Sequence, residues 1–223
     1  MPESPAQAPE ALTELPLFPL GTVLFPGALL PLQLFELRYL QMIGECERQG
    51  TGFGVVTLTQ GREVHRPGEA AEQFERMGTR VQIERIERPQ AGLVLVWCRG
   101  VDRFHVHNTT QRSDGLWRGQ VQALPPEPNL AVPEHLQHLS DQMHGALQSL
   151  SAQPSVVPPW NEAWRLQDCS WLSNRYGELL PLPLAMKYRL FALQEPLMRL
   201  ELIGDWVAPT SDGSPSQKPP ANS

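Results

Sequence analysis

Two histidines two positions apart, His105 and His107, have the spacing of a metal-ligand pair. They lie in a predicted strand, so their side chains share one face and could reach the same ion. A third ligand at a suitable spacing is not apparent, because His65 would reach them only through the fold. We interpret this pair as a polar strand face.

A second group, His135, His138 and Asp141, recurs every three residues in a predicted helix. This is also a ligand-like ladder, but the polar face of a helix has the same spacing. We favour the polar face for this group too, and we predict no metal site and no cofactor.

The lysines and cysteines offer little for covalent chemistry. Lys187 and Lys218 are the only lysines, and Lys187 lies beside Tyr188 and Arg189 without a recognisable serine that it could activate. No Gly-Lys pair occurs, so the phosphate-binding loop G-x-x-x-x-G-K-[ST] is missing. The three cysteines, at positions 46, 98 and 169, are far apart, which predicts reduced, buried thiols. We predict no catalytic residue.

Composition restricts the partners. The chain has 223 residues, 41% hydrophobic residues and a formal net charge of -6. Such a chain has no excess of cations to neutralise a phosphate backbone, which argues against nucleic acid as the main ligand. The first fourteen residues, MPESPAQAPEALTE, carry no positive charge and no apolar run, so we expect no secretory signal and a cytoplasmic location.

The distribution of residue types predicts two folded regions between two disordered tails, 1–13 and 208–223. Residues 14–124 alternate as strands do, and the proline-rich stretch 124–128 separates them from a helical region, 129–207. This order of strands and then helices predicts an α+β fold.

Strand patterns in the first region are short and bounded by glycine or turn residues. The expected strands are 53–58, 79–86, 93–98, 101–106 and 117–123. Alternation slips by one residue after Ile83, which predicts a β-bulge near Glu84. A helix is expected from Glu36 to Arg48, with Leu37, Leu40, Ile43 and Glu47 on one stripe, Tyr39, Met42 and Cys46 beside it, and Gly50 at its end.

Helical spacing predicts three or four segments in the second region, at about 133–151, 160–176, 183–194 and 196–206. The last two begin with proline, which suits a first helical turn. Trp160, Trp164 and Trp171 approximate helical spacing, and we interpret them as core rather than as a recognition surface. Packing of the apolar stripes against one another would give a helical bundle.

The apolar stretch 15–43, LPLFPLGTVLFPGALLPLQLFELRYLQMI, is interrupted by prolines at 16, 19, 26 and 31. Proline removes a backbone donor and breaks helices, so this stretch is not a membrane helix. Short strands joined by turns are expected instead, with a turn at Pro26-Gly27.

This same stretch resembles the start of the N-terminal domain of Lon proteases, which has an LPLFPL opening, a VLFPG turn and an FE-x-RY motif in this order. The resemblance continues through FGVV at 53–56, GTRVQI at 78–83, GVDRF at 100–104 and LPLP at 180–183. One departure is Leu37, where the family usually has proline. The resemblance implies a PUA-like β-barrel followed by a C-terminal helical bundle, in a standalone form without the ATPase loop and without the Ser-Lys dyad of the proteases.

The motif also implies the candidate binding residues Phe35, Glu36, Arg38 and Tyr39. A structural reading of two of them is that Glu36 suits the positive end of a helix and Arg38 pairs with a barrel carboxylate. The other reading is that they hold a peptide. We therefore expect a non-catalytic module that binds unfolded or apolar polypeptide segments or a partner protein, such as a protease, in proteolysis or quality control. The alternative is a PUA-like protein that binds nucleic acid or a modified base.

Overall fold

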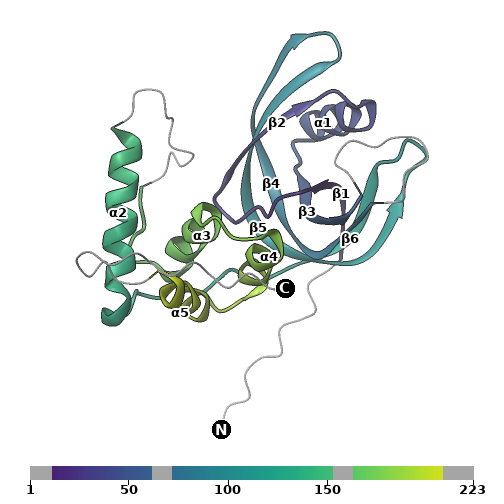
Figure 1. The fold of residues 1–223 in the computed structure, drawn as a ribbon. Helices are drawn as coiled ribbons and strands as arrows, with labels where there is room; N and C mark the ends of the chain where they lie inside the picture. The colour runs from purple at the N-terminus through teal and green to yellow at the C-terminus, as the bar shows by residue number, and fades with distance from the viewer. Residues whose placement is uncertain (1–11, 62–71, 153–162, 208–223) are drawn as a thin grey trace. The chain divides into compact units, whose positions relative to one another are not determined.

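The computed structural model describes residues 12–61, 72–152 and 163–207, and the chain divides into two compact units between residues 126 and 127. The strands belong to the first unit, and the helices after residue 126 form the second (Figure 1). The predicted tails fall almost entirely outside the described residues, since only Leu12 and Thr13 of them are described and Thr13 is the first residue of β1.

The described part of the first unit contains six strands and one helix. These are β1 (Thr13–Leu20), β2 (Leu29–Leu34), α1 (Leu37–Gln49), β3 (Phe53–Gln60), β4 (Gln73–Gln90), β5 (Leu93–Gln111) and β6 (Trp117–Ala123). The strands form one sheet in the order β2-β5-β4-β3-β1-β6, and β6 also pairs with β5. The pairings of β5, β4, β3, β1 and β6 therefore form a closed ring, with β1 and β3 parallel and the other neighbours antiparallel. The predicted α+β class is confirmed.

A cluster of apolar side chains from around this ring packs together, and Phe104 fills much of its centre. Its other buried members are Leu17, Val56, Val106 and Val121. Gly54 and Gly78 make room for the phenylalanine ring, because a Cβ at either position would lie 2.6 or 2.7 Å from its Cζ. These glycines are thus needed for a close approach rather than for a turn.

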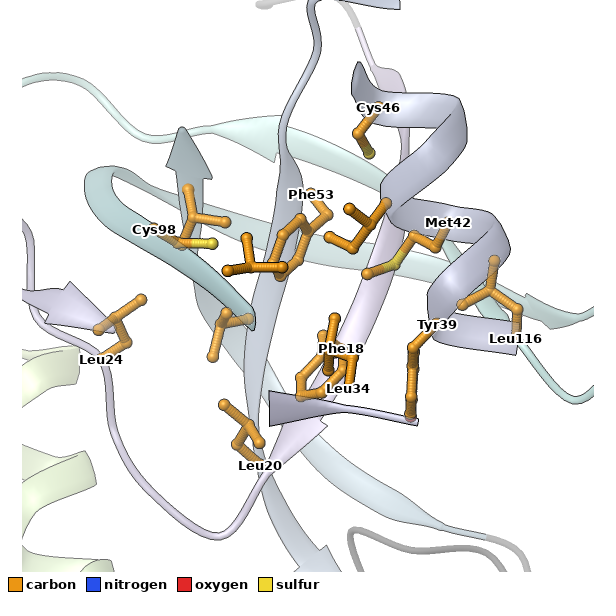
Figure 2. Packing of buried hydrophobic residues seen from close by; sticks show 14 of the residues in the cluster. Phe18, Leu20, Leu24, Leu34, Tyr39, Met42, Cys46, Phe53, Cys98 and Leu116 are labelled. Carbon is orange, nitrogen blue, oxygen red and sulfur yellow. The ribbon is translucent and has the colours of Figure 1, made fainter. Parts of the chain in front are cut away.

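A second cluster lies under α1, on the opposite face of the strands (Figure 2). Tyr39 and Met42 point from α1 toward Phe18 and Phe53, and the Phe18 and Tyr39 rings are 4.2 Å apart between centroids. The predicted helix is confirmed, and it ends at Gly50, whose φ of 63° is left-handed. The buried stripe differs from the expected one: Tyr39, Met42, Ile43 and Cys46 are buried, whereas Leu37 is 67% exposed.

The prolines of the opening stretch act as expected. The Ala28 N–H donates to the carbonyl of Phe25 at 3.1 Å, and Gly27 has a φ of 82°. Pro26-Gly27 is therefore the centre of a type II turn, which needs a residue with positive φ in its third position.

No helix within the described ranges is long and apolar enough to cross a membrane.

The pairing of the long strands β4 and β5 has three register shifts, and two of them explain the sequence pattern. Pairing slips between Ile83 and Arg85, which confirms the predicted bulge near Glu84. Pairing also slips between Arg80 and Val81, opposite Val101, so the two strands expected at 93–98 and 101–106 are one strand. The apparent break at Gly100 is a bulge because the ladder continues on both sides of it.

The second unit contains, in its described residues, a short 3-10 helix and four α-helices. They are η1 (Glu134–Leu136), α2 (Gln137–Ser151), α3 (Cys169–Leu179), α4 (Leu184–Ala192) and α5 (Pro196–Trp206). Three of the expected helices are present. The one expected from about 160 was placed too early: Trp160 is outside the described residues, and α3 begins only at Cys169.

Asp168 explains this late start. Its carboxylate accepts hydrogen bonds from the N–H groups of Ser170 at 2.9 Å and Trp171 at 3.4 Å, so it caps the helix. Trp164 lies before the cap and contacts the His144 ring, with 5.8 Å between centroids, whereas Trp171 is buried in α3. The core interpretation holds for Trp171, but Trp164 and Trp171 do not share a helix.

Candidate functional site

The four candidate residues lie where β2 ends and α1 begins, and they differ sharply in exposure. Phe35 is 56% exposed, whereas Arg38 is 5% and Tyr39 is 3% exposed. Glu36 is the residue before α1, and its side chain makes no capping hydrogen bond to the helix. Only Phe35 presents a large apolar surface to a ligand.

Arg38 is the centre of a hydrogen-bonded cluster, here called the clasp, that also contains Glu36, Glu72, the Gly115 carbonyl and Trp117. Its Nη2 donates to Oε1 of Glu72 at 2.9 Å, its Nη1 to the carbonyl of Gly115 at 3.0 Å, and its Nε to Glu36 at 3.2 Å. The Trp117 Nε1–H donates to the same Glu72 carboxylate at 2.6 Å. Burial lowers the pKa of Arg38, but the hydrogen bond to Glu72 and nearby negative charge outweigh it and raise the pKa. The expected pairing of Arg38 with a carboxylate is confirmed.

The clasp fixes the first turn of α1 and, through it, the neighbouring surface. Leu37 is the first residue of α1, a position that proline also suits, and its side chain is largely exposed. The consequence is that Arg38 and Tyr39 hold the backbone in place while Phe35 and Leu37 face outward.

A groove of about 270 Å³ lies beside this turn, between β1, β2 and the start of α1. It is lined mainly by apolar side chains: Phe18, Leu20, Pro31, Leu32, Leu34, Phe35 and Tyr39, with Gln33 and Glu36. In the described sheet β2 pairs with β5 alone, so its other edge has no strand partner. The groove thus combines apolar surface with an open strand edge.

Of the remaining candidates for chemistry, His105 and His107 lie side by side, with 5.2 Å between their ring centroids, as their spacing predicted. No group of three or more potential metal ligands occurs in the part of the chain that the structure describes, which excludes His65. His107 contacts Gln122 at 2.9 Å and His135 contacts Glu201 at 2.8 Å. Lys187 donates to the backbone carbonyl of Glu178 at 2.8 Å, and burial lowers its pKa.

The cysteines are buried and reduced, as predicted. Burial raises the pKa of the Cys98 thiol to about 12, so it remains protonated and unreactive at neutral pH.

Several arginines on the strands are paired with carboxylates. Arg80 pairs with Asp102, Arg88 with Glu47, Arg99 with Glu84, and Arg118 with Glu14 and Glu45. A phosphate backbone would need cations whose charge is not already neutralised. These pairs therefore weigh against a nucleic-acid surface here.

An α+β unit with an apolar groove and paired arginines on its strands has features expected of a binding module. The comparison with protein families makes this class specific: the model of the ATP-dependent protease La (LON) substrate-binding domain matches residues 14–208. The chain belongs to this family, and the membership supports a substrate-binding role.

Solved structures agree with this assignment. The Lon N-terminal domain protein from Xanthomonas campestris is 30% identical, with a TM-score of 0.68 over 88% of this chain and 99% of that one. The N-terminal domain of the Mycobacterium avium complex Lon protease shares the fold at 16% identity, with a TM-score of 0.57 over 87% and 97% of the two chains. Among curated proteins, cereblon from Danio rerio is 29% identical over 132 residues, which are 55% of this chain and 29% of cereblon.

Proposed function

We propose that this chain is a non-catalytic module that binds unfolded or apolar polypeptide segments through the groove between β1, β2 and α1. The observation that carries the proposal is Phe35, which is 56% exposed on the wall of an apolar groove. An exposed aromatic side chain at the edge of an apolar hollow is a typical anchor for a peptide. Family membership supports substrate binding in general.

The four candidate residues have separate roles in this proposal. Phe35 contacts the ligand, and Tyr39 and Glu36 form part of the groove wall. Arg38 is a positioning residue because its guanidinium is turned inward to Glu72. The module would act in ATP-dependent proteolysis or protein quality control in the cytoplasm, with a protease or another protein as partner.

The proposal keeps the predicted division of the chain. Residues 14–124 would form a PUA-like β-barrel domain, for which the closed ring of pairings is the support. Residues 129–207 would form a helical-bundle domain, supported by four α-helices in its described part.

Fluorescence anisotropy with a reduced, carboxymethylated model protein tests the binding. We expect a saturable signal in the micromolar range, and Phe35→Ser to weaken it about tenfold, the effect of losing one anchor of ~1.4 kcal/mol. The matched control is Leu37→Ser, which removes a similar exposed apolar side chain that does not line the groove. Absence of binding at high micromolar concentration, or equal weakening by both variants, contradicts the proposal.

The non-catalytic part has its own test. Incubation with casein, with and without ATP, should leave casein intact. Casein cleavage that is lost in Lys187→Ala would overturn it. A shift of RNA in a native gel at moderate salt would instead support the nucleic-acid alternative, which the paired arginines disfavour.

A further inference from the structure

Among the described residues, two strand edges in the first unit have no strand partner where β3 stops. β1 pairs with β3 only from Leu17 onward, so Thr13–Pro16 pair on one side, with β6. β4 pairs with β3 as far as Val81 and then continues to Gln90 paired with β5 alone. A strand that extended β3 backward beyond its first residue, Phe53, would lie between these two edges.

A cleft of about 970 Å³ occupies this place. Its walls are residues 13–16 of β1, 80–86 of β4, the end of α1 and the connection 50–52, with Val101 and Arg118. Where the sheet is complete, β3 separates β1 from β4 by two strand spacings, which is about 10 Å. The cleft is therefore one strand wide at the point where it begins.

The described chain before β3 turns away before it can fill this gap. Gly50 adopts a left-handed conformation at the end of α1, and Gly52 then lies against β4 so closely that a Cβ there would be 1.8 Å from the Val81 carbonyl oxygen. This oxygen points to the β3 side. Because alternate residues of a strand direct their backbone groups to the same side, those of Ile83 point into the cleft.

Charges on the cleft walls are already neutralised. Four glutamates and three arginines line the cleft, and each of them makes an ion pair. The pairs are Arg118 with Glu14 and Glu45, Arg88 with Glu47, Arg99 with Glu84, Arg80 with Asp102, and Arg85 with Glu87. A charged ligand would have to compete with these pairs. An uncharged polypeptide backbone would not, and its N–H and C=O groups match the two open edges.

We propose that the cleft binds an extended, uncharged segment of a client polypeptide as an added strand that continues the line of β3, parallel to β1 and antiparallel to β4. This inference rests on the proposed polypeptide binding and names its mode. A strand held between two edges directs the N–H groups of successive residues to opposite sides, so it can form hydrogen bonds with both edges. Recognition then depends on backbone N–H groups, and proline within the segment prevents it.

The experiment uses a fluorescein-labelled nonapeptide of alternating threonine and valine with a lysine at each end. We expect anisotropy to show saturable binding, and N-methylation of the central amide to weaken it at least tenfold although it adds apolar surface. Equal affinity of the two peptides overturns strand addition and leaves apolar binding intact. If neither peptide binds while the carboxymethylated protein does, only this inference fails; if nothing binds, the proposed function fails with it.

Two further measurements locate the strand. Bound nonapeptide should slow hydrogen exchange at the Ile83 amide at least tenfold, which docking through side chains alone would not do; unchanged exchange at this amide overturns the assignment. Gln82→Trp places a bulky side chain on an exposed wall of the cleft and should weaken nonapeptide binding about tenfold. Thr59→Trp, at an exposed position on β3 outside the cleft, is the matched control and should have no effect.

Discussion

Each unit of the chain contains a buried arginine that joins separate segments, but the two arginines lie in different surroundings. Arg38 of the first unit and Arg199 of the second are 5% and 0% exposed. Arg38 joins α1 to Glu72 and to the carbonyl of Gly115. Arg199 joins α5 to Glu127 at 2.7 Å, to Ser173 Oγ of α3 at 2.9 Å and to the carbonyl of Leu193 at 3.4 Å.

The difference lies in what else holds these segments. The strands around Arg38 are already paired in a ring, so its clasp acts locally on the first turn of α1, next to Phe35. Helices satisfy their backbone hydrogen bonds internally, so α3 and α5 are held together only by side chains. Arg199 therefore contributes to the assembly of its unit, whereas Arg38 shapes a surface.

The largest expected effect is that of Arg199→Met in the second unit. The substitution removes the ion pair between Arg199 and the nearly buried carboxylate of Glu127, which costs about 3–5 kcal/mol in comparable sites. Urea unfolding followed by circular dichroism measures the loss. Restoring neutrality with Glu127→Gln in the same chain should recover a large part of it.

The control in the same unit is Arg165→Met. Arg165 is 59% exposed in its side chain and pairs with Asp168 at 3.3 Å, so we expect a loss below about 1 kcal/mol. If Arg199→Met were no more destabilising than this, the buried arginine would not be what holds the second unit together.

A smaller loss of stability is expected for Arg38→Met, about 2 kcal/mol, because Glu72 keeps the hydrogen bond from Trp117 and the ring of strands remains. Polypeptide binding by the folded variant should nevertheless weaken several-fold, since the turn that carries Phe35 is no longer fixed. Anisotropy in buffer and urea unfolding give the two numbers separately.

Arg76→Met is the control for this prediction, because Arg76 is exposed on β4, donates to the His107 carbonyl at 3.1 Å and lines neither the groove nor the cleft. This variant should change neither the stability of the fold nor its polypeptide binding measurably. The comparison breaks down if Arg38→Met lowers stability as much as Arg199→Met, or if it leaves binding unaltered.

The sequence predicted those features that depend on residues close together in the chain. Alternation located the bulge at Glu84, Pro26-Gly27 located a turn, and Gly50 located the end of α1. It also indicated that Arg38 would pair with a carboxylate. It did not identify Glu72, because that pairing joins residues 34 positions apart and depends on how the sheet brings them together.

Other features were hidden for the same physical reason. Nothing in the helical pattern of 196–206 marks Arg199 as a core residue, because its burial depends on partners in three other segments. The capping role of Asp168 was overlooked although the residue type suits it. At the candidate site the motif named four residues together, and only the fold separates the exposed Phe35 from the inward Arg38.

The smallest expected effect is a loss of folding stability at alkaline pH, to which one buried group in each unit contributes. Burial raises the pKa of Cys98 in the first unit from 9.0, and that of Tyr176 in the second from 10.0, in both cases to about 12. A raised pKa in the folded state means that the unfolded chain loses its proton first. Stability is therefore intact below the unfolded pKa and falls between that value and the folded one. The window opens at pH 9 for Cys98 and at pH 10 for Tyr176.

Between pH 8 and pH 10, Cys98 should thus account for about 1 kcal/mol of lost stability and Tyr176 for less. Urea unfolding at both pH values tests this. In Cys98→Ala the difference between pH 8 and pH 10 should shrink by that amount, whereas Tyr176→Phe, which loses a hydrogen bond to the Leu139 carbonyl at either pH, should retain most of it. An unchanged difference in Cys98→Ala would mean that the thiol is already ionised or solvated in the fold, and that the core beneath α1 is looser than the packing around Phe53 indicates.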